Sequence, residues 1–94
     1  MGKSYRVFFD NQPRTQMKLL TPSIQREFMD ELRTMAQNPL GYQHLPLQYK
    51  LSGSCKIRVA GWRLIYTVHH DRQLIRVWRI GPRAEVYRGF EPIQ

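Results

Sequence analysis

Three short runs rich in β-branched and aromatic residues follow one another over residues 56–80, and they constrain the fold more than any other feature. The runs are Lys56–Ala60, Arg63–His70 and Gln73–Ile80, and each has the composition of a β-strand. Only two residues separate each run from the next. Connections this short join antiparallel neighbours, so the sequence predicts an antiparallel meander, with Asp71-Arg72 as a tight hairpin turn.

A strand and a short helix are predicted before this region. Residues 5–9 (YRVFF) have strand composition. Asp10 and Asn11 can cap a following helix, and Pro13 suits its first turn. We expect this short helix to run as far as Leu20.

The clearest helix signal covers residues 21–39. Thr21 offers a capping oxygen, Pro22 fits the first helical position, and Asn38-Pro39 ends the helix. Apolar residues recur between these points at helical spacing and form one stripe, namely Ile24, Phe28, Leu32, Met35 and Ala36. This stripe predicts a helix packed against a sheet.

The order of these elements predicts an α+β fold of the type β-α-α-β-β-β. We expect two N-terminal helices on one face of a small, mainly antiparallel four-stranded sheet, with the other face partly open. Residues 39–54 are rich in glycine, proline and serine and are predicted to loop over the surface. With 94 residues, the chain (1–94) is predicted to be one domain.

The chain is strongly basic, with a formal net charge of +8. Residues 1–47 carry six basic and four acidic side chains, whereas residues 48–94 carry nine and three. A positive electrostatic field concentrated in one half of the chain suits the binding of a polyanion such as nucleic acid. The alternative interpretation is a generic basic surface without a specific partner. No apolar run approaches the roughly 20 residues of a membrane span, so no membrane partner is expected. The single cysteine, Cys55, fits a reducing compartment, and we expect a cytoplasmic protein.

Alternation along the first run of the meander separates cations from apolar residues. Ile57 and Val59 share one face of that strand, and Lys56 and Arg58 share the other. If the apolar pair meets the helices, the cations stand on the open face. Arg63, Arg76 and Arg79 add charge to the neighbouring strands, but their faces depend on the register. Arg83 and Tyr87 follow the last strand, where the chain can fold over the sheet. A groove lined by these cations and a tyrosine would suit single-stranded RNA.

Each of these residues also has a structural interpretation. Lys56 and Arg58 fit a solvated strand face, and Arg63 could pair with Asp30 or Glu85. Tyr87 could equally be packed core or substrate contact, and two residues are expected to be core aromatics, Trp62 and Trp78.

The histidines do not indicate a metal site. His69 and His70 are adjacent and therefore point to opposite faces of a strand, and His44 lies far away in the sequence. No histidine, cysteine and carboxylate cluster has ligand spacing, so neither metal nor cofactor is expected.

The second half of the chain resembles the RelE branch of the RelE/ParE toxins of bacterial toxin–antitoxin pairs. That family has a Leu-x-Gly turn, a basic strand, a Gly-aromatic-Arg opening of the next strand, and Gly-x-Arg followed by Val-Tyr. The matching residues, in order, are Leu51-Ser52-Gly53, Lys56 and Arg58, Gly61-Trp62-Arg63, Gly81-Pro82-Arg83, and Val86-Tyr87. The predicted β-α-α-β-β-β order matches the family as well.

The resemblance implies a metal-independent endoribonuclease that cleaves messenger RNA in the A site of the 30S ribosomal subunit. A ribose 2′-OH would attack the adjacent phosphorus and leave a 2′,3′-cyclic phosphate. Arg63 and Lys56 would stabilise the developing charge, and Arg83 would lie near the leaving group. Tyr87 would orient the nucleotide or stack on it. The implied catalytic set is Lys56, Arg58, Arg63, Arg83 and Tyr87, and RNA binding would add Lys50. The implied partners are the ribosome, mRNA and an acidic, RelB-like antitoxin.

Arg58 departs from the best-known family pattern, in which a lysine at this place is the proposed general base. Arginine is effectively never deprotonated in proteins, whereas neighbouring cations and burial can push a lysine towards neutrality. Either Lys56 is the base, or no side chain is and water or the ribosome assists.

Two other functions remain open from the sequence. One is a ParE-like toxin that poisons DNA gyrase through protein contacts, and the other is an RNA-binding relative without activity. ParE-type sequences generally lack the set of basic residues and tyrosine, so its presence here favours RNA cleavage.

Overall fold

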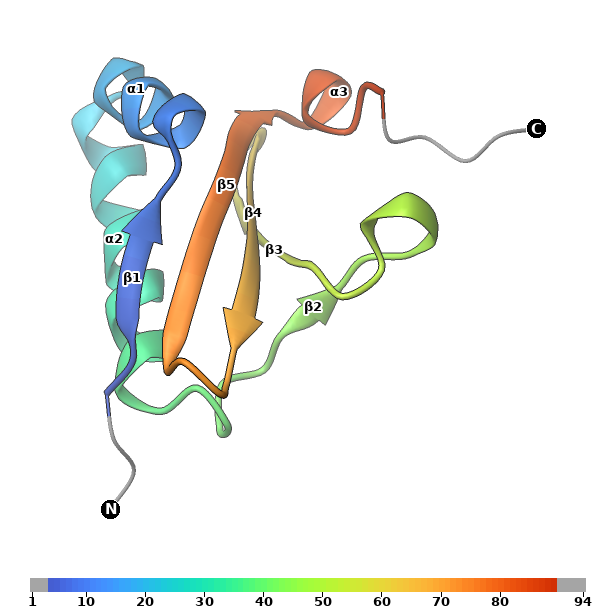
Figure 1. Cartoon of the computed structure of the whole chain (residues 1–94). Helices are drawn as coiled ribbons and strands as arrows, with labels where there is room; N and C mark the ends of the chain where they lie inside the picture. The colour runs from blue at the N-terminus through green and yellow to red at the C-terminus, as the bar shows by residue number, and fades with distance from the viewer. Residues whose placement is uncertain (1–3, 90–94) are drawn as a thin grey trace.

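The computed structural model describes residues 4–89 and contains a five-stranded mixed sheet with two helices, α1 and α2, on one side of it (Figure 1). The elements are β1 (Arg6–Phe9), α1 (Asn11–Leu19), α2 (Pro22–Gln37), β2 (Leu45–Pro46), the 3-10 turn η1 (Tyr49–Leu51), β3 (Cys55–Val59), β4 (Trp62–His69), β5 (Leu74–Pro82) and α3 (Arg83–Val86). In this part of the chain, no helix is long and apolar enough to cross a bilayer.

The strands lie in the order β1-β5-β4-β3-β2, with β1 parallel to β5 and all other neighbours antiparallel. The predicted α+β class, helix placement and meander are therefore confirmed. The predicted count of four strands is wrong, because β2 pairs with β3 through Leu45↔Lys56 and Pro46↔Cys55. A strand of two residues is too short to show any periodicity, which is why residues 39–54 looked like a loop throughout.

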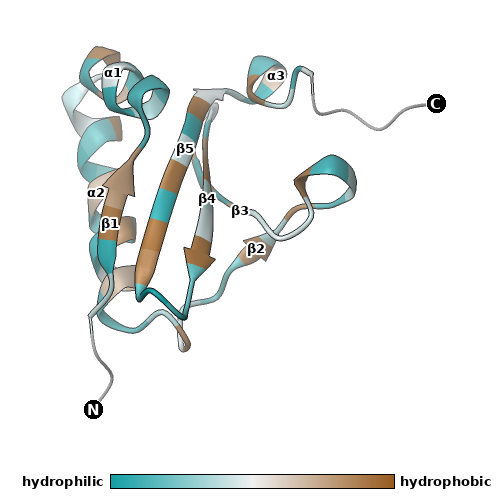
Figure 2. Ribbon diagram, in the orientation of Figure 1, coloured by the Kyte–Doolittle hydropathy of each residue, from teal (hydrophilic) through white to brown (hydrophobic). Residues whose placement is uncertain are grey.

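The main core lies between α2 and the sheet. Phe28, Leu32 and Met35 of the predicted stripe are at most 1% exposed. They pack with buried residues of three strands, namely Ile57, Val59, Leu64, Tyr66, Ile75, Val77 and Ile80. Each large apolar side chain buried in this way contributes about 1.5–3 kcal/mol. Apolar and polar residues alternate along β5, and Figure 2 shows this alternation as brown and teal bands.

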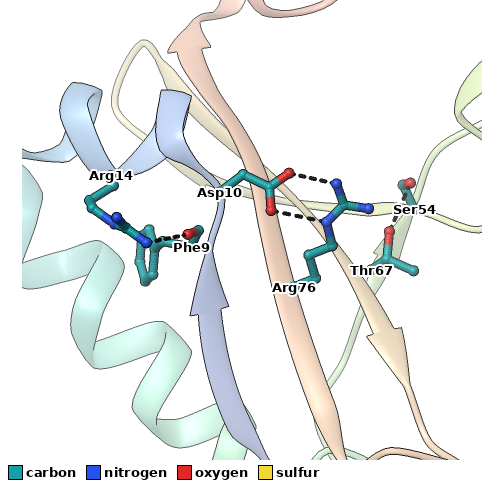
Figure 3. A network of polar contacts seen from close by, with 6 residues as sticks. All are labelled: Phe9, Asp10, Arg14, Ser54, Thr67 and Arg76. Atoms are coloured by element: carbon teal, nitrogen blue, oxygen red, sulfur yellow. Dashed lines mark hydrogen bonds and ion pairs between the residues drawn. The ribbon is translucent and has the colours of Figure 1, made fainter.

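The start of α1 is tied to the sheet by side chains that sequence reasoning assigned to other roles or overlooked. Asp10 occupies the N-cap position of α1, but its carboxylate makes no capping hydrogen bond. Instead it accepts two hydrogen bonds from Arg76, at 3.0 Å from Nε and 2.6 Å from Nη2 (Figure 3). Two residues later, the side-chain amide of Gln12 donates to the carbonyl of Ile80 (2.8 Å) and accepts from its N–H (3.0 Å). The amide thus continues the hydrogen-bond ladder of β5 beyond Phe9, where β1 ends.

The β4–β5 connection is longer than predicted. His69 pairs with Leu74, so residues 70–73 form the turn rather than Asp71-Arg72 alone. Gln73 supplies the positive φ of 52° that a glycine would adopt more easily. Further along the same pair of strands, Ile65 faces Arg79 and Tyr66 faces Val77, so Trp78 is an extra residue in β5. This bulge increases the local twist of the sheet beside Lys56, which pairs with Ile65.

The sheet face away from α1 and α2 is covered only at its margins. Leu51, Ile65 and Val86 are buried, yet they lie outside the cluster between the sheet and the helices. Figure 1 shows α3 and the segment containing η1 on this side of the sheet. α3 and the segment containing η1 therefore bury some apolar surface on a sheet face that is otherwise open.

Candidate functional site

Lys56 and Arg58 lie on the open face, as the alternation in the sequence predicted. Ile57 and Val59 are each 4% exposed on the helix face, whereas Arg58 is exposed and Lys56 is half-buried. The register, which the sequence could not supply, pairs Arg58 with Arg63. Directly paired residues share a sheet face, so Arg63 joins the other two cations.

α3 brings two further predicted residues to the same place. The chain leaves β5 at Pro82, and the N–H of Arg83 donates to the carbonyl of Gly61 at 2.8 Å. Val86 packs over Gly81, where an added Cβ would lie 3.4 Å from the Val86 backbone. These contacts hold α3 against the β3–β4 turn, so Arg83 and Tyr87 lie beside the cations of the sheet. This short helix was not predicted, because four residues carry no periodic signal.

Five side chains line one hollow of about 440 Å³, namely Lys56, Arg58, Arg63, Arg83 and Tyr87. All five residues proposed from the sequence as catalytic are thus neighbours in space. Lys50, the sixth residue proposed to bind RNA, is exposed on η1 and does not line the hollow. The hollow falls in the size range of small-molecule and cofactor sites, although its lining is far more basic than usual.

Arg63 is oriented by backbone carbonyls. Its Nη1 donates to the carbonyl oxygens of Ala60 (3.0 Å) and Trp62 (2.9 Å) in the β3–β4 turn. The alternative ion pair with Asp30 is not formed, because Asp30 pairs with Arg33 at 2.8 Å, and Arg63 has no ion pair with Glu85 either. The orienting carbonyls could not be identified from the sequence, although the Gly61-Trp62-Arg63 motif pointed to this turn.

The cations of the hollow are not neutralised within the part of the chain that the structure covers. The ion pairs among residues 4–89 are Arg33–Asp30 and Arg76–Asp10, both outside the hollow. Four positive charges around one open space create a strong local field for an anion. Arg76, on β5, is engaged by Asp10 and contributes less to that field.

The surroundings of Lys56 favour its neutral form. Burial lowers the pKa of its ammonium below the ordinary value, and the positive charges of the neighbouring guanidiniums, Arg58, Arg63 and Arg83, lower it further. A lysine with a lowered pKa is better able to accept a proton near neutral pH.

Tyr87 presents a polar atom without a partner. Its hydroxyl oxygen is buried and makes no hydrogen bond with any residue from 4 to 89. Burial raises the pKa of the Tyr87 phenol, while the positive charges of Arg63 and Arg83 oppose this shift. Arg63 lies close enough to the hydroxyl to lower its pKa, although the two groups do not meet the geometry of a hydrogen bond. The phenol therefore stays protonated at neutral pH, and its O–H has no acceptor among residues 4–89.

The other polar candidates have structural roles. The Nε2–H of His44 donates to the carbonyl of Pro39 (2.7 Å), and its Nδ1 accepts from the Tyr66 hydroxyl (2.6 Å). His70 is hydrogen-bonded to Tyr5 at 2.9 Å. In the described part of the chain, no three histidine, cysteine or carboxylate side chains are placed to hold a metal ion. Trp62 packs partly buried against the main core, and Trp78 lies half-buried at the bulge in β5.

Comparisons with known proteins agree on one family. The sequence model of the family described as "ParE toxin of type II toxin-antitoxin system, parDE" matches residues 7–87. An Escherichia coli protein described as RelE-like toxin is 31% identical over 90 residues, which cover 88% of this chain and 90% of that protein.

Solved structures share the fold at low sequence identity. A chain of the RelBE2 toxin–antitoxin complex of Mycobacterium tuberculosis has a TM-score of 0.72 at 23% identity and covers 90% of this chain and 98% of its own length. A mutant of E. coli toxin RelE in the free state also has a TM-score of 0.72, at 18% identity, covering 94% and 99%. The YoeB/ParE toxin of Agrobacterium tumefaciens has a TM-score of 0.70 at 17% identity, and the match covers 82% of this chain and 96% of that toxin.

Proposed function

The chain belongs to the RelE/ParE superfamily of toxins from toxin–antitoxin systems, and on that basis we propose that it is a ribosome-dependent endoribonuclease that cleaves translated mRNA in the A site. One observation carries this proposal. Lys56, Arg58, Arg63, Arg83 and Tyr87 line a single hollow in which no described carboxylate neutralises the cations. Such a site suits an RNA phosphate and the nucleotide attached to it.

In the proposed reaction, a ribose 2′-oxygen attacks the adjacent phosphorus. The bond from phosphorus to the 5′-oxygen of the next nucleotide breaks, giving a 2′,3′-cyclic phosphate and a free 5′-hydroxyl. Negative charge grows on the phosphorane oxygens, and preorganised cations stabilise it without reorganising. Arg63 suits this role because two backbone carbonyls already fix its guanidinium.

The reaction also requires a proton acceptor for the 2′-OH and a donor for the leaving oxygen. Lys56 is the proposed acceptor, since burial and three guanidiniums lower its pKa. Arg58 cannot take this role because a guanidinium keeps its proton. Arg83 is proposed to stabilise the leaving oxygen, and the free hydroxyl of Tyr87 is proposed to orient the nucleotide or the phosphate.

An acidic antitoxin and the ribosome are the proposed partners, which would place the protein in the cytoplasm. Similar folds occur in toxin–antitoxin complexes, including E. coli RelE bound to an antitoxin RelBc peptide. An antitoxin segment that lays carboxylates over the hollow would neutralise its four cations, which have no ion pair among residues 4–89.

Gyrase inhibition is the competing function, since the matching family description names ParE. The deciding experiment is induced expression in a bacterial host, with primer extension on translated and untranslated copies of one message. Under our proposal, growth stops and the translated copy alone is cut. Growth arrest with intact messages and accumulating DNA breaks would establish the gyrase activity instead.

A further inference from the structure

An exposed tyrosine lies on η1, outside the hollow. Tyr49, the first residue of η1, is 67% exposed, and the exposed Lys50 follows it. A large aromatic ring in water next to a cation is a common element of single-strand binding surfaces, where a base stacks on the ring.

The turn that carries Tyr49 is fixed by hydrogen bonds at each step. The N–H of Ser52 donates to the carbonyl of Tyr49 (3.0 Å), and the N–H of Ser54 donates to that of Leu51 (3.0 Å). Leu51 is only 7% exposed, and the Ser54 hydroxyl is hydrogen-bonded to that of Thr67 on β4 at 3.2 Å (Figure 3). η1 is therefore anchored to the sheet, so the Tyr49 side chain projects from a rigid frame.

The backbone at Tyr49 adopts a conformation that tyrosine rarely takes. Its φ is 60°, in the left-handed region where glycine and asparagine are favoured. The exposed ring gains little from packing against residues 4–89, so contacts in this part of the chain do not explain why a tyrosine occupies this position.

The positions of η1 and α3 relate the ring to the hollow. Both lie on the same side of the sheet, and η1 leads directly into β3 (Figure 1). Lys56 follows Ser54 by two residues, a distance of about 7 Å along an extended chain. A nucleic acid strand that leaves the hollow past Lys56 towards the start of β3 would run in the direction of η1.

We propose that Tyr49 is a second base-stacking platform, which together with Lys50 extends the RNA site by at least one nucleotide beyond the hollow. This inference rests on the proposed RNA-directed function. It assigns to Tyr49 a contact with a neighbouring base and to the hollow the phosphate at which cleavage occurs.

The test is binding of the full chain to 2′-O-methyl oligonucleotides, which lack the attacking hydroxyl and cannot be cleaved. Fluorescence anisotropy compares a dinucleotide with an octanucleotide of the same base composition. Tyr49→Ala should weaken octanucleotide binding about 5- to 150-fold, the effect of losing one stacked base, and leave dinucleotide binding unchanged. Tyr49→Phe should bind like the wild type because it keeps the ring. Leu40→Ala, a change at a side chain that is 82% exposed, is the matched control and should have no effect.

Folding is measured separately with Tyr49→Asn, which tolerates the left-handed backbone. Its Tm should equal or exceed that of the wild type, while its octanucleotide binding falls as in Tyr49→Ala. A Tm loss of several degrees would assign Tyr49 a structural role and overturn the proposal.

The remaining outcomes separate this proposal from the general function. If Tyr49→Ala binds the octanucleotide normally while Arg63→Ala does not, the platform is disproved and RNA binding in the hollow stands. If Tyr49→Ala weakens only the complex with the cognate antitoxin, the ring belongs to a protein interface. If the wild type binds neither oligonucleotide, alone or on a programmed ribosome, both proposals fail.

Discussion

At the residue scale, the central question is how one lysine differs from the arginines around it. Lys56, Arg58, Arg63 and Arg83 all carry positive charge into one hollow, but only lysine can release its proton. The sequence identified these residues through alternation and motif order. It could not show that Lys56 is the one whose pKa is lowered, because that shift comes from burial and from charges on three different segments.

Replacing Lys56 with arginine separates proton transfer from charge stabilisation. We expect Lys56→Arg to keep RNA affinity but lose roughly 10²–10⁴-fold in the rate of cleavage, as for removal of a general base. Lys56→Ala should then be no slower in the chemical step. The measurement is single-turnover cleavage on programmed ribosomes, with binding assayed in parallel.

The pH dependence of the same reaction is the control. If neutral Lys56 is required, the wild-type rate rises with pH and levels off below 10.5, the ordinary pKa of a lysine, because the pKa of Lys56 is lowered. The Lys56→Arg rate should lack this rise. If the Lys56→Arg enzyme is active, Lys56 is not the proton acceptor, and both Lys56 and Arg58 only stabilise negative charge.

The Tyr87 hydroxyl makes a second prediction possible, because it has no hydrogen-bond partner among residues 4–89. Tyr87→Phe removes no hydrogen bond to residues 4–89, so the free energy of unfolding should stay within about 0.5 kcal/mol of the wild-type value. Cleavage should fall roughly 10²-fold if the hydroxyl donates to charge that develops on the phosphate. Denaturant unfolding and single-turnover cleavage measure the two effects, and a Phe variant with full activity would restrict Tyr87 to packing.

At the scale of elements, the sequence predicts long segments well and short ones poorly. The stripe on α2 and the three strands of the meander carry enough periodic residues to be recognised. β2 and α3 have two and four residues and owe their structure to tertiary contacts, such as the hydrogen bond from Arg83 to Gly61. Two of the five residues that line the hollow, Arg83 and Tyr87, are placed by α3, so the shape of the hollow could not be predicted even though its residues could.

The Gln12 amide is the clearest link between elements, and its loss has a calculable cost. Gln12→Ala leaves both backbone groups of Ile80 without their partners, which should lower the free energy of unfolding by about 1–3 kcal/mol. The matched control is Gln37→Ala, at an exposed position ending α2, with an expected change within about 0.5 kcal/mol. Urea denaturation measures both, and equal midpoints for the two variants would show that the amide adds nothing.

At the scale of the whole molecule, charge and layers divide the protein into two sides. Helices α1 and α2 cover one face of the sheet, and the cations of the hollow lie on the other side. The excess of basic residues in the second half of the chain anticipated this division. The register of β3 against β4 was needed to show that Arg63 faces the same way as Arg58.

This division predicts a specific response to salt. Each phosphate neutralised on a single strand contributes about −0.7 to the slope of log affinity against log salt, so an oligonucleotide that gives each of the four cations its own phosphate would show a slope of about −3. Arg83→Ala should make the slope less negative by about 0.7, as measured by oligonucleotide binding between low and physiological salt. Arg33→Ala is the control, since Arg33 pairs with Asp30 on α2 and should leave the slope unchanged. A wild-type slope near zero would contradict an electrostatic role for the hollow.

The parallel pairing of β1 with β5 also governs how the protein reaches its native state. Gln12 and Ile80, which meet at the end of this pairing, are 68 positions apart along the chain. Contacts between such distant partners are entropically costly to close and tend to form late in folding. Ile80 lies near the end of β5, the strand that leads into α3, so we expect the end of β5 and the hollow beside it to become fully ordered only after the N-terminal segment has docked. A chain still being synthesised would then be harmless until this long-range closure, and the closure rate would set the interval in which an antitoxin can intercept it.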